Sequence, residues 1–236
     1  MPRFQRARKP EEKEVRRRAI LEAARDLARE VGPMDLGLNA LGRRSGVSKP
    51  NIYRYFEGRE DVLLRLYTSE LADVVAALEA RLGTVASIGE VASVLASEHL
   101  ARPLLCQLAG MVSSILEHNL SAEAIASSKA EMLALVPRAV GALRRSLPWL
   151  GDEDAWFALR AVELHLAALW PMANPSRAAR EVLSRPEFAA LIVDAGRDYP
   201  RFIEVLLEGL RAKATAARQP AARVAGRPRA AAIRRR

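Results

Sequence analysis

The sequence predicts an all-α protein with an N-terminal three-helix domain and a larger helical domain after it. Three observations lead to this class. Apolar residues recur at helical spacing through nearly all of the first 210 residues, no segment keeps a period-two alternation, and Gly, Pro, Asn or Asp mark the breaks between segments. Half of the 236 residues are hydrophobic, which is enough to build a sizeable core. The length fits one large or two small domains.

The first predicted helix covers residues 11–31. Pro10 precedes it and Gly32-Pro33 follows it, so both ends carry the expected signals. Its apolar positions repeat every four residues: Val15, Ala19, Ala23, Leu27 and Val31.

Two short helices are predicted next, over 38–45 and 49–55, with Gly46-Val47 between them. A helix-turn-helix needs such a sharp turn, and its second helix enters the major groove of DNA. Ser48 is a favourable N-cap for the second helix. Pro50 then falls in the first turn, where a backbone N–H has no acceptor within the helix.

The second of these helices has an inner and an outer side. Ile52 and Phe56 are four residues apart and face the core, while the outer side keeps cationic, amide and phenolic groups that suit phosphate contacts. Asn51 can read adenine through its amide, or it can cap the turn locally. The outer residues are Lys49, Asn51, Tyr53, Arg54 and Tyr55.

The rest of the chain also reads as helices. A long amphipathic segment over 58–83 carries Glu60 and Asp61 in its first turn, where they favour the positive end of the helix dipole. The last residues are biased to Ala, Arg and Pro, cannot bury a core and are expected to be disordered. Further helices are predicted over 88–101, 103–118, 121–146, 152–171, 186–194 and 198–217.

The net charge of +9 is unevenly distributed. Residues 1–66 hold 16 Lys and Arg against 10 Asp and Glu, residues 67–210 hold 12 against 18, and residues 211–236 hold 9 and no acid. A basic N-terminal region indicates a polyanionic partner, most often nucleic acid, and the acidic middle argues against binding over the whole surface. A solvated surface with a chance asymmetry is the alternative.

Several functional classes lack the residues they need. Cys106 is the only cysteine, which excludes a disulfide within the chain. His99, His118 and His165 are too far apart for a metal-binding pair on one helix, and no phosphate loop or nucleophile elbow is present. We therefore expect no enzyme, metal or cofactor. No signal segment or apolar run of membrane-spanning length occurs, so we expect a cytoplasmic protein without a membrane partner.

"ILEAARDLAREVG" followed by "LGRRSGVSKPNIYRYFEGREDVL" resembles the DNA-binding domain of the tetracycline-repressor (TetR) family of transcriptional regulators. The turn, the order of the aromatic residues and the charge pair all agree in register. Two positions depart from the pattern: Gly37 stands where a capping Thr or Ser is usual, and Gly42 replaces an Ala. A glycine inside a helix weakens it by about 1 kcal/mol.

The resemblance implies a division of the chain and a set of DNA contacts. The division is a basic arm over 1–13, a DNA-binding domain over 14–74, a ligand-binding and dimerisation domain over 75–211, and a disordered basic tail over 212–236. Asn51 with Lys49 would set sequence preference. The candidate DNA-binding residues are Arg44, Ser48, Lys49, Asn51, Tyr53, Arg54, Tyr55 and Arg59.

The resemblance further implies a homodimer, a pseudo-palindromic double-stranded operator and a small-molecule effector. The dimer helices would be 152–171 and 198–211; the first is apolar nearly all round, which also fits burial inside one subunit. The same Met and Cys residues that could line an effector pocket also fit a plain core. The pocket candidates are Cys106, Met111, His118, Met132 and Trp156.

We therefore predict a sequence-specific repressor that a small molecule releases from its operator. The alternative is an architectural DNA-binding protein that binds mainly through its tail and without sequence preference.

Overall fold

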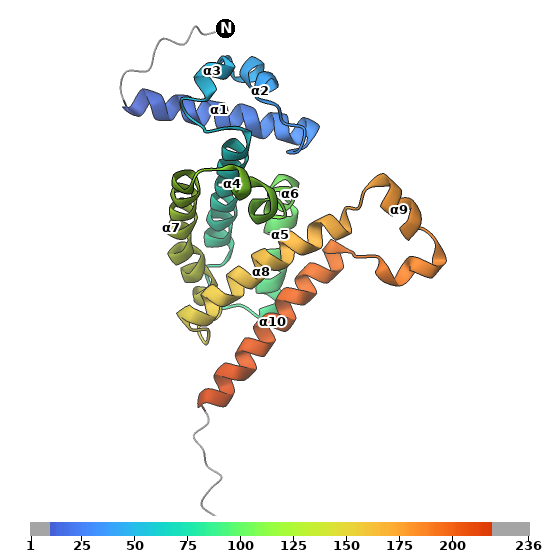
Figure 1. Ribbon diagram of the computed structural model, residues 1–236. Helices are drawn as coiled ribbons and strands as arrows, with labels where there is room; N and C mark the ends of the chain where they lie inside the picture. Colours follow the sequence, from blue (N-terminus) through green and yellow to red (C-terminus); the bar gives the residue numbers. More distant parts are fainter. Residues whose placement is uncertain (1–9, 219–236) are drawn as a thin grey trace, which may run out of the picture.

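The computed structural model describes residues 10–218, and every regular element in that range is a helix, which confirms the all-α class. The head (residues 10–58) holds α1 (Pro10–Val31), α2 (Leu38–Ser45) and α3 (Lys49–Ile52). It lies at one end of the molecule, with α1 across the top of α4 (Figure 1).

The head is built around one face of α1. Ile20 and Ala24 of this face are fully buried, and Leu41, Ile52 and Phe56 from the other two helices and the turn after α3 are buried to nearly the same degree. The predicted inward side of the second short helix, Ile52 and Phe56, is therefore confirmed. α3 itself ends at Ile52, but hydrogen-bonded turns continue the path to Phe56, whose N–H donates to the Ile52 carbonyl at 3.1 Å.

One long helix, α4 (Arg59–Arg81), joins the head to the body (residues 84–218). Every residue of this helix from Asp61 to Thr68 is buried, including the charged Asp61 and Arg65. The expected domain boundary at 74/75 falls inside this continuous helix. α4 therefore has no flexible joint at that point, and the part of α4 next to the head is its most deeply buried segment.

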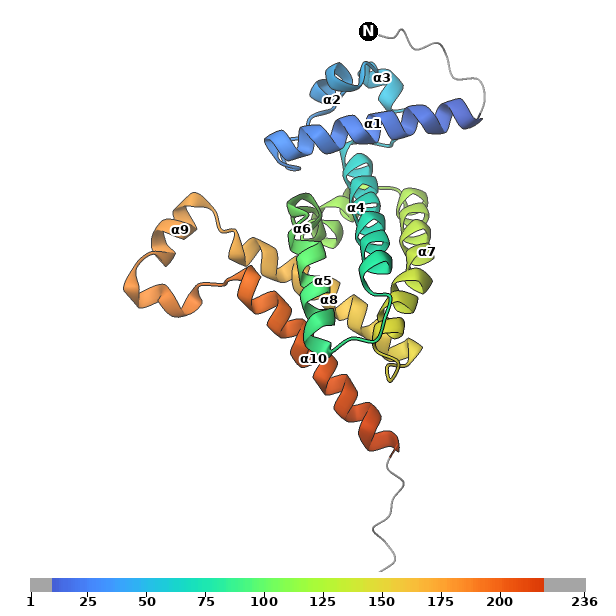
Figure 2. The same cartoon turned by 180° about the vertical axis from the view of Figure 1, so that it is seen from behind.

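The body surrounds the lower part of α4. Here α5 (Ile88–Leu100) and α6 (Pro103–Ala109) lie on one side, and α7 (Ala122–Ser146) packs along α4 on the other (Figures 1 and 2). The N-terminus of α5 is fixed by a capping box, in which Ser87 and Glu90 bond each other's backbone N–H groups.

α8 (Asp152–Ala173) and α10 (Ala195–Arg218) pack against each other. They also cover α5 and α6, and in Figure 1 they cross in front of these two helices. Between them the chain makes an excursion over 174–194, which carries α9 (Arg177–Leu183) and a 3-10 turn, η3 (Pro186–Leu191). α9 and η3 pack on each other, and the excursion projects sideways from the body (Figure 1). No residue of the excursion is buried.

The structure corrects the sequence-based prediction at four places. The helix predicted over 103–118 is α6 followed by a π-helical turn, η1 (Val112–Leu116), and a 3-10 turn, η2 (Glu117–Asn119). The break falls at Gly110, where α8 approaches so closely that a Cβ would lie 3.1 Å from the Ala167 carbonyl oxygen. α9 was not predicted, and the helix predicted over 186–194 is the shorter η3.

The fourth correction concerns the C-terminal tail. α10 continues to Arg218, so the first seven residues of the expected tail are helical. The remainder of the tail, 219–236, and most of the N-terminal arm, 1–9, lie outside the described residues. Within 10–218 no helix is long and apolar enough to cross a bilayer.

Candidate DNA interface and apolar cavity

The turn between α2 and α3 depends on two glycines. Gly46 caps α2 in the left-handed conformation with φ 68°, which a side chain rarely adopts. Gly42 lies where the turn folds back, since a Cβ there would be 2.8 Å from the Val47 carbonyl oxygen. The interpretation of Gly42 as only a weakening of α2 was therefore incomplete, because the missing side chain lets the turn approach α2.

This turn presents a compact polar surface, the reading surface, formed by exposed residues at and after the start of α3. The segment 38–56 holds four basic residues and no acidic residue, so its own side chains contribute only positive charge. The Tyr53 side chain is half exposed although it is aromatic. The residues of the reading surface are Ser48, Lys49, Asn51, Tyr53 and Arg54.

Two side chains of the reading surface, Ser48 and Asn51, make no hydrogen bond within residues 10–218. Ser48 occupies the N-cap position of α3, but its hydroxyl makes no capping hydrogen bond, contrary to its predicted capping role. The Asn51 side chain likewise has no hydrogen-bond partner within residues 10–218. Both side chains are therefore available to an external partner.

The other three candidate DNA-binding residues are engaged within the chain. The Arg44 guanidinium donates to both carboxylate oxygens of Glu30 at 2.7 Å. Arg59 pairs with Glu60 at 2.8 Å and donates to the Met34 carbonyl at 3.0 Å. Tyr55 is half buried and packs against the core. These three residues lie at the edge of the reading surface rather than in it.

A second candidate site is an apolar cavity of about 390 Å³ in the body, which is lined by α4, α7 and α8 and by His99 of α5. Most of its wall consists of aliphatic side chains. The lining residues are Tyr67, Leu71, Val74, Val75, Leu78, His99, Lys129, Met132, Leu133, Leu135, Val136, Ala139, Trp156, Leu159, Arg160, Val162 and Glu163.

Three polar lining residues form one hydrogen-bonded cluster. The Glu163 carboxylate contacts His99 Nε2 at 2.7 Å and accepts from the Tyr67 hydroxyl at 3.3 Å. His99 Nδ1 lies 2.8 Å from the Leu95 carbonyl, which can only accept. Both ring nitrogens thus face acceptors, an arrangement that suits the charged imidazolium.

The same contacts set the protonation of the cluster. Burial lowers the pKa of His99, but the charge and hydrogen bond of Glu163 and the bond to Leu95 outweigh it, so this pKa stands above its usual value. Burial, together with the charge of Glu163, raises the pKa of Tyr67 well above its usual value. Tyr67 therefore stays a phenol, and the raised pKa of His99 favours its imidazolium form beside the Glu163 carboxylate.

Of the five predicted pocket residues, Met132 and Trp156 line the cavity, while Cys106, Met111 and His118 lie outside its lining. Cys106 is buried in the core; its thiol donates to the His99 carbonyl, and burial raises its pKa to about 12. Met111 is also buried, and His118 is exposed on η2. The alternative interpretation, plain core, therefore applies to Cys106 and Met111.

Sequence reasoning missed most of the lining because it comes from four helices that are far apart in the chain. His99 and Glu163 are 64 positions apart, and no local pattern pairs them. The one usable signal was a charged residue at a core-facing position of an amphipathic helix, as Glu163 is.

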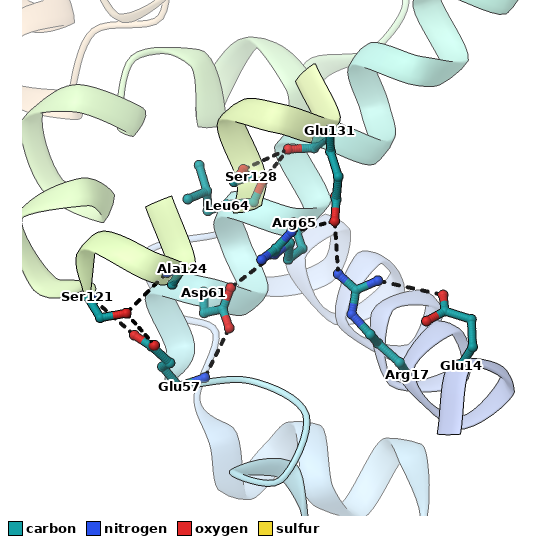
Figure 3. A network of polar contacts seen from close by, with 11 residues as sticks. Glu14, Arg17, Glu57, Asp61, Leu64, Arg65, Ser121, Ala124, Ser128 and Glu131 are labelled. Atoms are coloured by element: carbon teal, nitrogen blue, oxygen red, sulfur yellow. Dashed lines mark hydrogen bonds and ion pairs between the residues drawn. The ribbon is translucent and has the colours of Figure 1, made fainter. Parts of the chain in front are cut away.

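A polar network connects the head, α4 and α7 (Figure 3). Glu131 of α7 accepts from Arg65 Nη1 at 2.6 Å and lies 3.8 Å from Arg17 Nη2 on α1. Arg65 also donates from Nε to Asp61 at 3.2 Å. The Arg17 guanidinium in turn lies over the Phe56 ring, 5.8 Å from its centroid.

A second connection lies at the start of α7 (Figure 3). The Glu57 carboxylate, in the loop that ends the head, accepts from the Ser121 backbone N–H at 3.0 Å and from its hydroxyl at 2.5 Å. The hydrogen bonds from Ser121 lower the pKa of Glu57. α7 is therefore fastened to the head at two points, and α7 is also one wall of the cavity.

α8 and α10 leave apolar side chains in solvent. Leu164 is 66% exposed and Val205 65% exposed, and Phe157 is 44% exposed. The excursion between these helices adds Val182, Leu191 and Ile192. Exposed apolar residues in such number on one part of a protein mark an interaction surface.

Comparison with known families gives two matches that together cover most of the chain. Residues 20–66 match the family model described as bacterial regulatory proteins, tetR family. Residues 64–214 match the model described as the tetracyclin repressor-like C-terminal domain. A comparison with curated protein sequences gave no significant match.

Solved structures with the same fold come from several bacteria. A protein described as a possible TetR family transcriptional regulator from Streptomyces coelicolor A3(2) has 22% identity and a TM-score of 0.56, covering 84% of this chain and 99% of that one. The regulator FadR from Bacillus subtilis, solved with stearoyl-CoA, has 16% identity and a TM-score of 0.51, covering 81% and 98%. A single-substitution variant of TetR from Acinetobacter baumannii AYE, solved with minocycline, has 16% identity and a TM-score of 0.51, covering 82% and 95%.

Proposed function

Because the chain belongs to the TetR family of DNA-binding transcriptional regulators, we propose that it is a homodimeric repressor whose operator affinity a small molecule lowers. The observation that carries the proposal is the reading surface: an exposed, acid-free set of cationic, amide and phenolic side chains on a helix-turn-helix. We propose that it acts in the cytoplasm on chromosomal DNA.

The residues of the reading surface divide by chemistry. Lys49, Tyr53 and Arg54 suit phosphate and groove contacts, which fix the orientation of the head on the duplex. The Asn51 amide, which has no partner among the described residues, suits a bidentate contact to adenine, and Lys49 suits guanine. Arg44 and Arg59 contact DNA only if they leave Glu30 and Glu60, so we assign them a supporting role at the edge of the contact.

We propose that two copies associate through α8 and α10. This places the exposed Phe157, Leu164 and Val205 against a second copy of the chain. The excursion over 174–194 extends the same surface: helices as short as α9 are marginal without tertiary packing, and within the described chain α9 packs chiefly on η3. A two-fold dimer fits a pseudo-palindromic operator with half-sites about 34–36 Å apart or a multiple of that distance.

We propose that the cavity holds the effector, and that effector binding moves α7, which in turn moves the head. A ligand that fills the space between α4 and α7 pushes α7 outward. Because Glu131 pairs with Arg17 of α1 and Ser121 bonds Glu57 in the loop that ends the head, this movement tilts the head relative to α4. The two heads of a dimer then no longer fit successive major grooves.

Selection of bound sequences from genomic fragments, with the full-length protein and excess bulk DNA, tests the proposal. The expected result is enrichment of one pseudo-palindromic sequence, bound by a dimer. Binding that shows no preference over bulk DNA would instead support the architectural alternative.

A further inference from the structure

The charges that face the cavity do not balance, and this imbalance indicates the chemistry of its ligand. Four charged side chains line it: His99, Glu163, Lys129 and Arg160. His99 and Glu163 neutralise each other across 2.7 Å. Lys129 is paired with Glu117, whose oxygen lies 2.5 Å from the ammonium nitrogen.

Arg160 is the exception. Its guanidinium has no ion pair or hydrogen bond to any side chain within residues 10–218, although Glu163 is only one turn further along α8. Glu163 is engaged with His99 and Tyr67 instead. Among the described residues, the cavity therefore carries one positive charge without a partner, and most of the wall beside it is aliphatic.

The position of Arg160 suits a ligand head group at the cavity mouth. Arg160 is exposed, and Trp156, which lies one turn before it on α8 and also lines the cavity, is 39% exposed. The aliphatic residues of α4, such as Val74 and Leu78, are buried at the opposite wall. A ligand can thus place an apolar body against α4 and keep its polar end beside Arg160.

We infer that the cavity binds an apolar molecule with a single anionic group, a carboxylate in the simplest case, which pairs with Arg160. A guanidinium matches a carboxylate with two parallel hydrogen bonds, and such charge-assisted bonds are stronger than neutral ones. A cation would meet an uncompensated positive charge here. The inference rests on the proposed effector role of the cavity and specifies its ligand.

The cavity volume sets the size of the ligand body. At roughly 30 Å³ for a water-sized group, a volume of about 390 Å³ accepts about a dozen non-hydrogen atoms. Ten-carbon chains and two-ring aromatic acids fall in this range and serve as probes.

Binding of matched probes to the full-length protein, measured by calorimetry without DNA, tests the inference. The probes are decanoate, decanol and decylamine, with 2-naphthoate and naphthalene-2-methanol as an aromatic pair. We expect each carboxylate to bind at least about tenfold more tightly than its neutral counterpart, and decylamine to bind most weakly. Arg160→Gln should remove the preference and leave the affinity for decanol unchanged.

Arg145→Gln is the matched control, because Arg145 is an exposed arginine on α7 outside the cavity lining; this variant should keep the preference. Equal or tighter binding of the neutral probes, a preference that survives Arg160→Gln, or no binding of any probe would overturn the inference. Operator release, measured separately, distinguishes the two proposals. Carboxylate binding without release refutes only the regulatory role, and release by acid and alcohol alike refutes only the ligand class.

Discussion

The head and the body are both built from helices, but they differ in where their polar side chains lie and whether these are paired. The polar side chains that suit DNA contact in the head come from one continuous segment, 48–54, where they are exposed and mostly without partners within residues 10–218. The body gathers its cavity from four helices, and three of its polar lining residues, Tyr67, His99 and Glu163, are hydrogen-bonded to one another. The reading surface therefore suits a large external partner, while the cavity offers room for a small molecule.

The difference also shows where each region is vulnerable. Substitutions on the reading surface should change DNA affinity without changing stability, because those side chains carry little packing. Substitutions at the body's paired groups should change stability or ligand response first, since each removed partner leaves another buried group unsatisfied. The link between the two regions, through Glu131 and Glu57, should affect neither property alone but the coupling between them.

The largest expected effect comes from the exposed apolar side chains of the body. Leu164→Asp places a charge in the proposed dimer surface twice per dimer, and burying an unpaired charge costs several kcal/mol. We expect the dimer to weaken by about 100-fold or more and operator affinity to fall with it, while the monomer stays folded. Sedimentation velocity and circular dichroism measure both. Dimers of wild-type strength would show that the heads are paired through another surface.

The next effect should be confined to the head. Tyr53→Ala or Lys49→Ala removes a groove contact worth about 1–3 kcal/mol, so operator affinity should fall about 10- to 100-fold at unchanged melting temperature. Arg145→Ala, which removes a positive charge near the C-terminus of α7 and outside the cavity lining, is the control and should bind as the wild type does. Unchanged sequence-specific binding by both head variants would refute the assigned reading surface.

A smaller effect on stability is expected from the cluster in the body. Glu163→Leu leaves His99 buried without its acceptor and should destabilise the protein by about 1–3 kcal/mol. The folded-state pKa of His99 is raised, so the stability from the pair is fully present below about pH 6.5, the unfolded value, and is lost as pH rises through the folded pKa.

Urea unfolding at several pH values measures this contribution. Wild-type stability should decline over that window, and Glu163→Gln, which can hydrogen-bond to a neutral imidazole, should show a flatter profile. Identical pH profiles for the two proteins would mean that His99 does not carry the proton in the folded state.

The smallest expected effect lies in the link between the regions. Glu131→Gln keeps the shape of the side chain but removes the charge that attracts Arg65 and Arg17. We expect ligand affinity and operator affinity to change little when each is measured alone. The coupling free energy between ligand and operator binding should fall by about 0.5–2 kcal/mol.

A matched control for this variant is Glu123→Gln, an exposed residue in the first turn of the same helix. Its coupling should equal that of the wild type. If Glu131→Gln and Glu123→Gln show the same coupling, Glu131 does not transmit the movement of α7 to the head. The hydrogen bonds between Glu57 and Ser121 are then the next contact to test.

The sequence by itself determined the helical class, the helix-turn-helix and its outward side chains. These features are local: the inward Ile52 and Phe56 are four residues apart, and the turn glycine Gly46 lies between two short periodic segments. Periodicity and turn chemistry within about ten residues decide them, so no distant contact was needed to predict them.

Only the tertiary structure decided the lining of the cavity, the break at Gly110 and the engagement of Arg44 and Arg59. Each depends on a residue distant in sequence: Gly110 meets Ala167, and His99 meets Glu163. Helical periodicity shows that a side chain points inward but not which helix it meets there. That choice is made when helices pack, because burial and the pairing of polar groups are properties of the assembled core.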